Sequence, residues 1–144
     1  MRKLAFTLVE LLIVVIILGI LAAVVIPQFS DASTDARVSS LQTNLATMRG
    51  QIELYRLQHN GNYPPLASFP TVMTSKTNAD HTTTGTPTLG PYMQAIPYNP
   101  FSSPPANNVD NTAAAITKAW YYDGAGTFRA NDGQSTGGVA HSTY

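Results

Sequence analysis

Glu10 is the only charged side chain in the apolar run at residues 6–26, so its chemistry needs an explanation. A carboxylate is costly to leave unpaired in a membrane helix, so Glu10 needs a partner. The small residue Ala5 precedes Phe6 and follows two basic residues. A cut between Ala5 and Phe6 would remove those charges and create an α-amino group on Phe6, a cation suited to pairing with Glu10 of a neighbouring subunit. Alternatively, Glu10 reaches the lipid headgroups as a single acid in a signal anchor.

The element that must position Glu10 is a helix long enough to span a bilayer. Residues 6–26 would extend for about 31 Å as an α-helix, close to the thickness of a hydrocarbon core. An ordinary secretory signal has its small-residue cleavage site after the apolar region. Here the small residue comes before it, so cleavage would leave the apolar helix on the product.

These residues, KLAFTLVE followed by LLIVVIILGILAAVVIP, resemble the class III leader of type IV pilins and type II secretion pseudopilins. The resemblance implies that a prepilin peptidase cuts between Ala5 and Phe6 and that Phe6 is then N-methylated. It also implies that Glu10 directs assembly into a helical homopolymer. The family more often has glycine at the position of Ala5.

Two residues predict a weak point in the apolar helix. Gly19 lowers helix propensity, and Pro27 removes the hydrogen bond to the carbonyl of Ala23. A kink or locally melted stretch is therefore expected between Gly19 and Pro27, as the resemblance also implies for some filaments. The alternative is that both residues are simply tolerated, as glycine and proline often are in membrane helices.

The helix is expected to continue to about Gln58 with an amphipathic second half. A stripe of apolar residues recurs at spacings of three and four, which is typical of a helix face that packs on a core; it comprises Val38, Leu41, Leu45, Met48, Ile52 and Tyr55. Gly61, within HNGN and shortly before two prolines, is the expected cap.

The chain after this helix is expected to form a small head. Thr71 to Thr88 is polar and lacks apolar periodicity, so we expect a surface loop, with O-linked sugar or filament contacts as alternatives. The stretch from Gly90 to Phe101 resembles a proline-rich segment of the major pseudopilins, and its Tyr92, Ile96 and Phe101 could cover the helix stripe.

Two short runs in the head predict a β-hairpin. Residues 119–123 and 127–131 are rich in β-prone side chains and are joined by Gly-Ala-Gly. A third strand is expected around Val109 to Thr117, with Trp120, Tyr122 and Phe128 in the core. The predicted fold class is therefore α+β: a long N-terminal helical spine, apolar and then amphipathic, with a small C-terminal antiparallel β-sheet head.

The sequence offers little catalytic chemistry. His59, His81 and His141 lack metal-ligand spacing, and neither a phosphate-binding loop nor a nucleophile motif is present. We therefore expect no enzymatic activity and no cofactor. Asp123, Asn131 and Asp132 leave two readings open: ordinary turns, or a calcium site, which the resemblance to major pseudopilins implies.

The predicted organisation is a leader (1–5), an apolar transmembrane and filament-core helix (6–29), an amphipathic half (30–59) and a head (60–144). The charges balance at 8 basic and 8 acidic side chains, so no nucleic-acid partner is predicted. The absence of cysteine favours a pseudopilin over a disulfide-closed adhesive pilin. The leading function is a major-pseudopilin-like filament subunit of a type II secretion machine.

Alternatives to that function are a type IV pilin for adhesion, motility or DNA uptake, and a single-pass anchor for a binding head. The expected partners of the filament subunit are identical subunits, the prepilin peptidase and inner-membrane assembly machinery. Its expected location is the inner membrane before assembly, and then a periplasmic or cell-surface filament.

Overall fold

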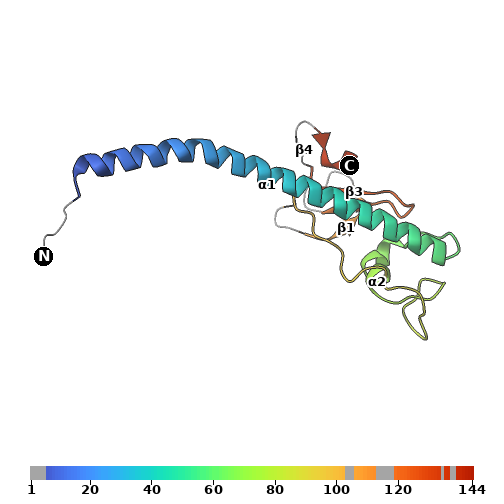
Figure 1. Ribbon diagram of the computed structural model, residues 1–144. Coiled ribbons are helices and arrows are strands. Elements are labelled where there is room, and N and C mark those ends of the chain that lie inside the picture. Colours follow the sequence, from blue (N-terminus) through green and yellow to red (C-terminus); the bar gives the residue numbers. More distant parts are fainter. Residues whose placement is uncertain (1–5, 103–105, 113–118, 134, 137–138) are drawn as a thin grey trace, which may run out of the picture. The chain divides into compact units, whose positions relative to one another are not determined.

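The computed structural model describes residues 6–102, 106–112, 119–133, 135–136 and 139–144. Contacts divide the chain into two compact units, one ending at Ala36 and one running from Arg37 to Tyr144. A long helix, α1 (Leu8–Gln58), provides the secondary structure of the first unit and the first element of the second (Figure 1). The first unit exposes its apolar side chains, whereas the second encloses a hydrophobic core.

The first unit is an apolar helix, coloured blue in Figure 1. Its large hydrophobic side chains, from Leu8 to Phe29, are between 43% and 79% exposed. By length and composition, this part of α1 can cross a membrane, because its most apolar 18-residue window has a mean hydropathy of 3.2. The helix therefore forms where the sequence predicted it, although it begins at Leu8 rather than at Phe6.

The second unit is built on the later part of α1, which carries the predicted stripe. The side chains of Leu41, Leu45, Met48, Ile52 and Tyr55 are all buried, with at most 1% exposed. Val38, at the start of the stripe, is only half-buried.

The helix ends where the sequence predicted. The amide of Gly61 donates to the carbonyl of Arg56 at 2.9 Å, and Gly61 has a φ of +87°, which favours glycine.

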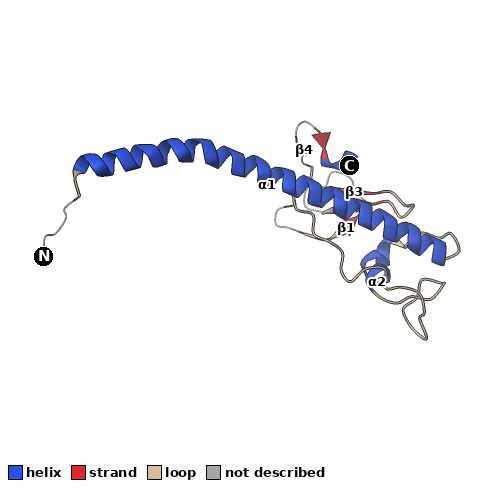
Figure 2. Cartoon of the chain, in the orientation of Figure 1, coloured by secondary structure: helices blue, strands red, loops and turns tan. Residues whose placement is uncertain are grey.

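The expectation of a loop from Thr71 to Thr88 is wrong at its start. Residues 66–74 form a short 3₁₀ turn, η1 (Leu66–Ser68), and a helix, α2 (Phe69–Thr74), coloured blue in Figure 2. Phe69, Val72 and Met73 lie at helical spacing and are buried. The loop reading missed this helix because Phe69 precedes the polar stretch. Further along, Thr77 is buried and bridges to Leu89.

The head contains a mixed three-stranded sheet in the order β1 (Val109–Asp110), β2 (Trp120–Tyr122), β3 (Phe128–Ala130). The β2–β3 hairpin is antiparallel, as predicted, with Tyr121 opposite Arg129. The purely antiparallel sheet is a wrong prediction, because β1 pairs parallel to β2, with Val109 opposite Trp120. Residues 113–118, which include the end of the predicted third strand, lie outside the described residues.

A second pairing follows β3. Strands β4 (Ser135–Thr136) and β5 (Val139–Ala140) form a small antiparallel hairpin that the sequence did not predict. A 3₁₀ turn, η2 (His141–Thr143), comes next. Figure 1 shows these red segments beside the part of α1 that belongs to the second unit.

The core lies between the α1 stripe, α2 and the sheet. Trp120, Tyr122 and Phe128 are buried, as predicted, and belong to the same cluster as the α1 stripe. The ring centroids of Phe69 and Tyr122 lie 4.5 Å apart, so α2 contributes an aromatic side chain that was not predicted to be in the core. Tyr92 and Ile96 join the core, as predicted, and Phe101 packs against it while half-buried.

Candidate functional site

The predicted processing site lies at the start of the described chain. Phe6 is 72% exposed and precedes α1. Ala5 and the rest of the leader lie outside the described residues. Cleavage between Ala5 and Phe6 and methylation of Phe6 therefore stay predictions.

Glu10 lies in the first turn of α1, where it forms a capping box with Thr7. The backbone amide of Thr7 donates to Oε2 of Glu10 at 2.8 Å, and its hydroxyl donates to the same oxygen at 2.7 Å. In return, the amide of Glu10 donates to Oγ1 of Thr7 at 3.2 Å. The spacing Thr-x-x-Glu is a known signature of a helix start, so the signal for this box was present in the sequence although the box itself was not predicted.

The capping box uses only one oxygen of the carboxylate. Oε2 of Glu10 accepts both bonds from Thr7, whereas Oε1 has no bond within the described part of the chain. A carboxylate has lone pairs for several donors, so Oε1 can accept a further bond while the box stays closed. The side chain is also exposed, so a cation outside the subunit can reach it.

The two residues of the predicted weak point lie within α1. The helix is assigned without a break through positions 19 and 27. A Cβ added at Gly19 would meet no atom within 4 Å, so no contact in the subunit requires glycine there. Melting of this stretch in a filament stays a prediction.

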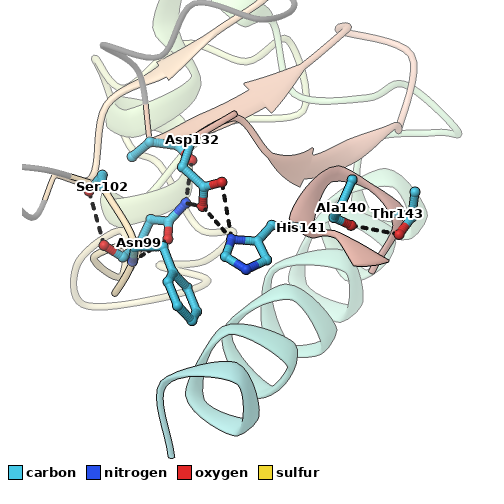
Figure 3. A network of polar contacts seen from close by, with 8 residues as sticks. Asn99, Ser102, Asp132, Ala140, His141 and Thr143 are labelled. Atoms are coloured by element: carbon cyan, nitrogen blue, oxygen red, sulfur yellow. Dashed lines mark hydrogen bonds and ion pairs between the residues drawn. The ribbon is translucent and has the colours of Figure 1, made fainter. Parts of the chain in front are cut away.

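A polar network in the head was not anticipated from the sequence (Figure 3). Nδ1 of His141 lies 3.1 and 3.2 Å from the two carboxylate oxygens of Asp132. The side-chain amide of Asn99 donates to the same carboxylate at 2.8 Å and to the carbonyl of Ala119 at 2.9 Å. The network joins the proline-rich segment, the start of β2, the residues after β3 and η2.

This network is shielded from water. The side chains of Asp132 and His141 are 1% and 0% exposed. The ring of Phe101 covers His141 with a centroid distance of 4.0 Å, and the backbone amide of Phe101 donates to Oδ1 of Asn99. Because paired polar groups at low dielectric interact strongly, the network fixes the C-terminal turn onto the head.

The three residues of the possible calcium site do not come together. Asp123 accepts bonds from the amides of Ala125 and Thr127 in the hairpin turn. Asn131 and Asp132 follow β3 at the opposite end of the hairpin, because Tyr122 is opposite Phe128 and Trp120 is opposite Ala130. Within the described residues, no group of three or more His, Cys, Asp or Glu side chains could hold a metal ion.

The hydrogen bonds around Asp123 also explain its ionisation. Burial acts to raise the pKa of Asp123, but hydrogen bonds from Thr127 and from the amide of Ala125 outweigh it and lower the pKa. Asp123 is thus a charged turn residue, which agrees with the ordinary-turn reading.

A second unanticipated cluster lies where α1 ends. The rings of Tyr55 and His59 stack with centroids 3.7 Å apart, and His81 stacks on His59 at 5.1 Å. The hydroxyl of Tyr55 lies 2.6 Å from Nδ1 of His81, and Nε2 of His59 lies 3.0 Å from the carbonyl of Asn78. The cluster therefore attaches the polar loop to α1. His59 follows Tyr55 by four residues, so extending the helix stripe would have found it.

The environment of His81 disfavours its charged form. Partial burial and the neighbouring His59 lower the pKa of His81, while the carboxylate of Asp80 acts in the opposite direction.

Comparison with known proteins shows which families this chain is similar to. Residues 1–26 match the family described as the prokaryotic N-terminal methylation motif. The chain is 28% identical over 102 residues to the type II secretion system core protein G of Klebsiella pneumoniae, with 71% of each protein covered. It is 29% identical over 99 residues to core protein G of Pseudomonas aeruginosa, covering 69% of this chain and 68% of that protein.

Part of the chain is also similar to a pilus protein. Over 61 residues, the chain is 36% identical to the type IV narrow pilus major component PilA5 of Thermus thermophilus, covering 42% of this chain and 53% of that protein. No solved structure matches the chain significantly. The predicted resemblance is therefore confirmed: the chain carries the N-terminal methylation motif and is similar to type II secretion core G proteins and to a type IV pilus component.

Proposed function

We propose that this relative of core G proteins and type IV pilins is a major-pseudopilin-like subunit of a helical filament in a type II secretion machine. The observation that carries the proposal is the exposed apolar part of α1, with Glu10 near its start. Such a surface is stable only in lipid or against other apolar helices. Identical subunits that pack through a contact that does not close form a helical filament, which buries this surface.

In this proposal, the subunit is processed before it assembles. A prepilin peptidase cuts between Ala5 and Phe6 and the new N-terminus is methylated. The apolar helix holds the subunit in the inner membrane as a single pass. Inner-membrane assembly machinery then moves it into a periplasmic or cell-surface filament. The methylation motif at residues 1–26 supports the first of these steps.

Glu10 is the proposed assembly acid. In the isolated subunit, Thr7 engages Oε2 of Glu10 and leaves Oε1 available. The α-amino group of Phe6 on a neighbouring subunit would bring a cation to Oε1, and opposite charges attract strongly away from water. Glu10 thus has a hydrogen-bonding partner in the membrane and gains a charged partner in the filament.

The second candidate is a type IV pilin that forms surface pili. Similarity to the Thermus thermophilus pilus component, which is confined to part of the chain, favours it. Similarity to core G proteins extends over about 70% of the chain, which favours the secretion filament. A third candidate, a single-pass anchor with a binding head, requires neither the cut nor the acid. Electron micrographs of surface material from the native cell would distinguish constitutive surface pili from a secretion filament.

The processing step can be tested by mass spectrometry of the native protein. We expect an N-terminal methyl-Phe6. Filaments that still carry residues 1–5 would contradict the peptidase step and with it the proposed function.

The role of Glu10 can be tested with two variants, Glu10→Val and Glu10→Gln, which both remove its charge. Glu10→Val should be retained in the membrane but should enter filaments poorly, because it loses the charge and gains apolar surface. Glu10→Gln keeps the size and the oxygen that accepts from Thr7, but lacks the charge, so it should also assemble poorly. Normal polymerisation of either variant in the absence of wild-type subunits would refute the ion pair.

We also propose that the head folds without a cofactor and performs no catalysis. The hydrogen bonds that Asn99 and His141 make to Asp132 support folding without a cofactor. Millimolar calcium and a chelator should give the same thermal midpoint for the head, because a ligand stabilises only a state that binds it. A midpoint that rises with calcium concentration would instead establish a calcium site.

A further inference from the structure

An open groove of about 260 Å³ lies on the second unit, where the C-terminal residue meets α1. Its lining residues are Gln42, Leu45, Ala46, Arg49 and Tyr144. The amide of Tyr144 donates to the carbonyl of His141, so the buried Asp132 network also holds the C-terminal wall of the groove. The wall is therefore fixed by the fold.

The groove contains an oriented cation. Nε of Arg49 donates to the carbonyl of Phe128 on β3 at 3.0 Å. This bond fixes the plane of the guanidinium group, while its two terminal nitrogens have no hydrogen bond or ion pair within the described part of the chain. A guanidinium held in this way presents paired donors that match a carboxylate. Arg37 and Lys76 are exposed cations too, but no described bond orients them.

Two acidic side chains are available, among the described residues, to fill such a groove. The other acidic side chains already have partners in the subunit: Glu10 with Thr7, Glu53 with Arg56, Asp80 with Thr82, Asp110 with Thr112, Asp123 with its own turn, and Asp132 with His141. Asp31 and Asp35 are exposed on α1 and have no hydrogen bond or ion pair among the described residues. They are four residues apart, so they share a helix face and repel each other, and a cation between them would relieve this repulsion.

We propose that the Arg49 groove binds the Asp31 and Asp35 face of a second copy of this chain. The inference rests on the proposed filament, in which helices of neighbouring subunits pack in parallel with an axial shift. Such a shift can bring the acidic face of one copy beside the groove of another. The contact pairs opposite charges, so it would favour one particular axial shift between neighbouring subunits. Packing of the apolar helices alone specifies this shift less precisely.

Cysteine crosslinking tests this contact in the full chain, which contains no cysteine of its own. The variant Asp35→Cys with Gln42→Cys keeps Arg49 and its bond to β3. Oxidation of its filaments should give a ladder of disulfide-linked oligomers. The matched control, Asp35→Cys with Lys76→Cys, places the second thiol at another exposed position outside the groove and should give no ladder. Filaments that crosslink equally in both variants, or in neither, would overturn the proposal.

Charge reversal gives an independent readout. Arg49→Glu should lower filament yield by at least about tenfold, because it places like charges together. Combining it with Asp31→Arg and Asp35→Arg should restore much of the yield, whereas Lys76→Glu alone should leave it unchanged. Normal filament yield from Arg49→Glu would refute the groove contact while the filament function stands. Failure of the unaltered chain to form filaments would instead refute the proposed function.

Discussion

The buried pair of Asp132 and His141 allows a sharp test of what stabilises the head. His141→Leu keeps an apolar side chain under Phe101 but removes the donor that lies 3.1 Å from the Asp132 carboxylate. Leaving a buried polar group without one of its hydrogen-bond partners typically costs about 1–3 kcal/mol, because the group stays desolvated. The side chains of His141 and Asp132 are at most 1% exposed, so water cannot replace the lost donor without opening the structure.

The expected loss is large relative to the total stability. A domain of this size has an unfolding free energy of about 5–15 kcal/mol, and each 1 kcal/mol shifts the midpoint by roughly 4–8 °C. His141→Leu should therefore lower the thermal midpoint by at least about 4 °C. The only tryptophan, Trp120, is buried and donates to the carbonyl of Pro97, so its fluorescence reports unfolding of the head directly.

Ser142→Ala is the matched control for this measurement. Ser142 is the next residue along η2 and is exposed, so the thermal midpoint of the Ser142→Ala variant should differ from that of the unaltered chain by less than about 2 °C. A loss below about 1 kcal/mol for His141→Leu would refute the reasoning. It would mean that the pair contributes little beyond an apolar contact.

Three further predictions concern α1 and the loop beyond it. A chain shortened to begin at Ser30 should be a soluble, folded monomer that cannot assemble. In this shortened chain, Ile52→Ala should lower the free energy of unfolding, measured by thermal melts, by roughly 2–5 kcal/mol, because Ile52 is buried. Thr83→Ala should change it almost not at all, because Thr83 is exposed. Growth of filaments from this chain would place the assembly surface elsewhere. Folding lowers the pKa of His81 from its ordinary value of 6.5. The stability that the neutral ring contributes is therefore fully present above pH 6.5 and declines as the pH falls below 6.5. His81→Gln should flatten this pH dependence, measured as the urea concentration at the unfolding midpoint. Identical pH profiles for the two chains would exclude this role. Thr7→Val should remove the two capping bonds that involve the Thr7 hydroxyl and reduce helicity at the start of α1, measured by amide exchange in micelles, whereas Thr7→Ser should not. Equal exchange rates for the two variants would contradict the box.

The parts of this fold that could be predicted are those specified by local patterns. The stripe from Leu41 to Tyr55 follows the helical repeat, and Gly61 has the backbone freedom that its cap requires. The β2–β3 hairpin was visible because its strands and its Gly-Ala-Gly turn are adjacent in the chain. In each case, the residues that decide the structure are only a few positions apart.

What could not be predicted depends on contacts between distant residues. Asn99 and Asp132 are 33 positions apart, and nothing in either segment indicates that they meet. The parallel pairing of β1 with β2 likewise depends on the path of the chain between them, not on the residues of β1. The Thr7 capping box is different, because its signal was local: the same carboxylate that is suited to an ion pair between subunits also caps its own helix.

The groups that lack a partner in the isolated subunit indicate which surface drives assembly. In the described head and the rest of the described chain, no buried side-chain nitrogen or oxygen lacks a hydrogen-bond partner. The exposed groups that most need a partner lie on α1: its apolar residues, Oε1 of Glu10, the Asp31 and Asp35 carboxylates, and the terminal nitrogens of Arg49. Because association is driven by surface that the monomer leaves unsatisfied, α1 should determine whether subunits polymerise and in which register. The head can then change the rest of its surface without loss of assembly, provided that it keeps the core that holds the later part of α1 and the Tyr144 wall of the Arg49 groove.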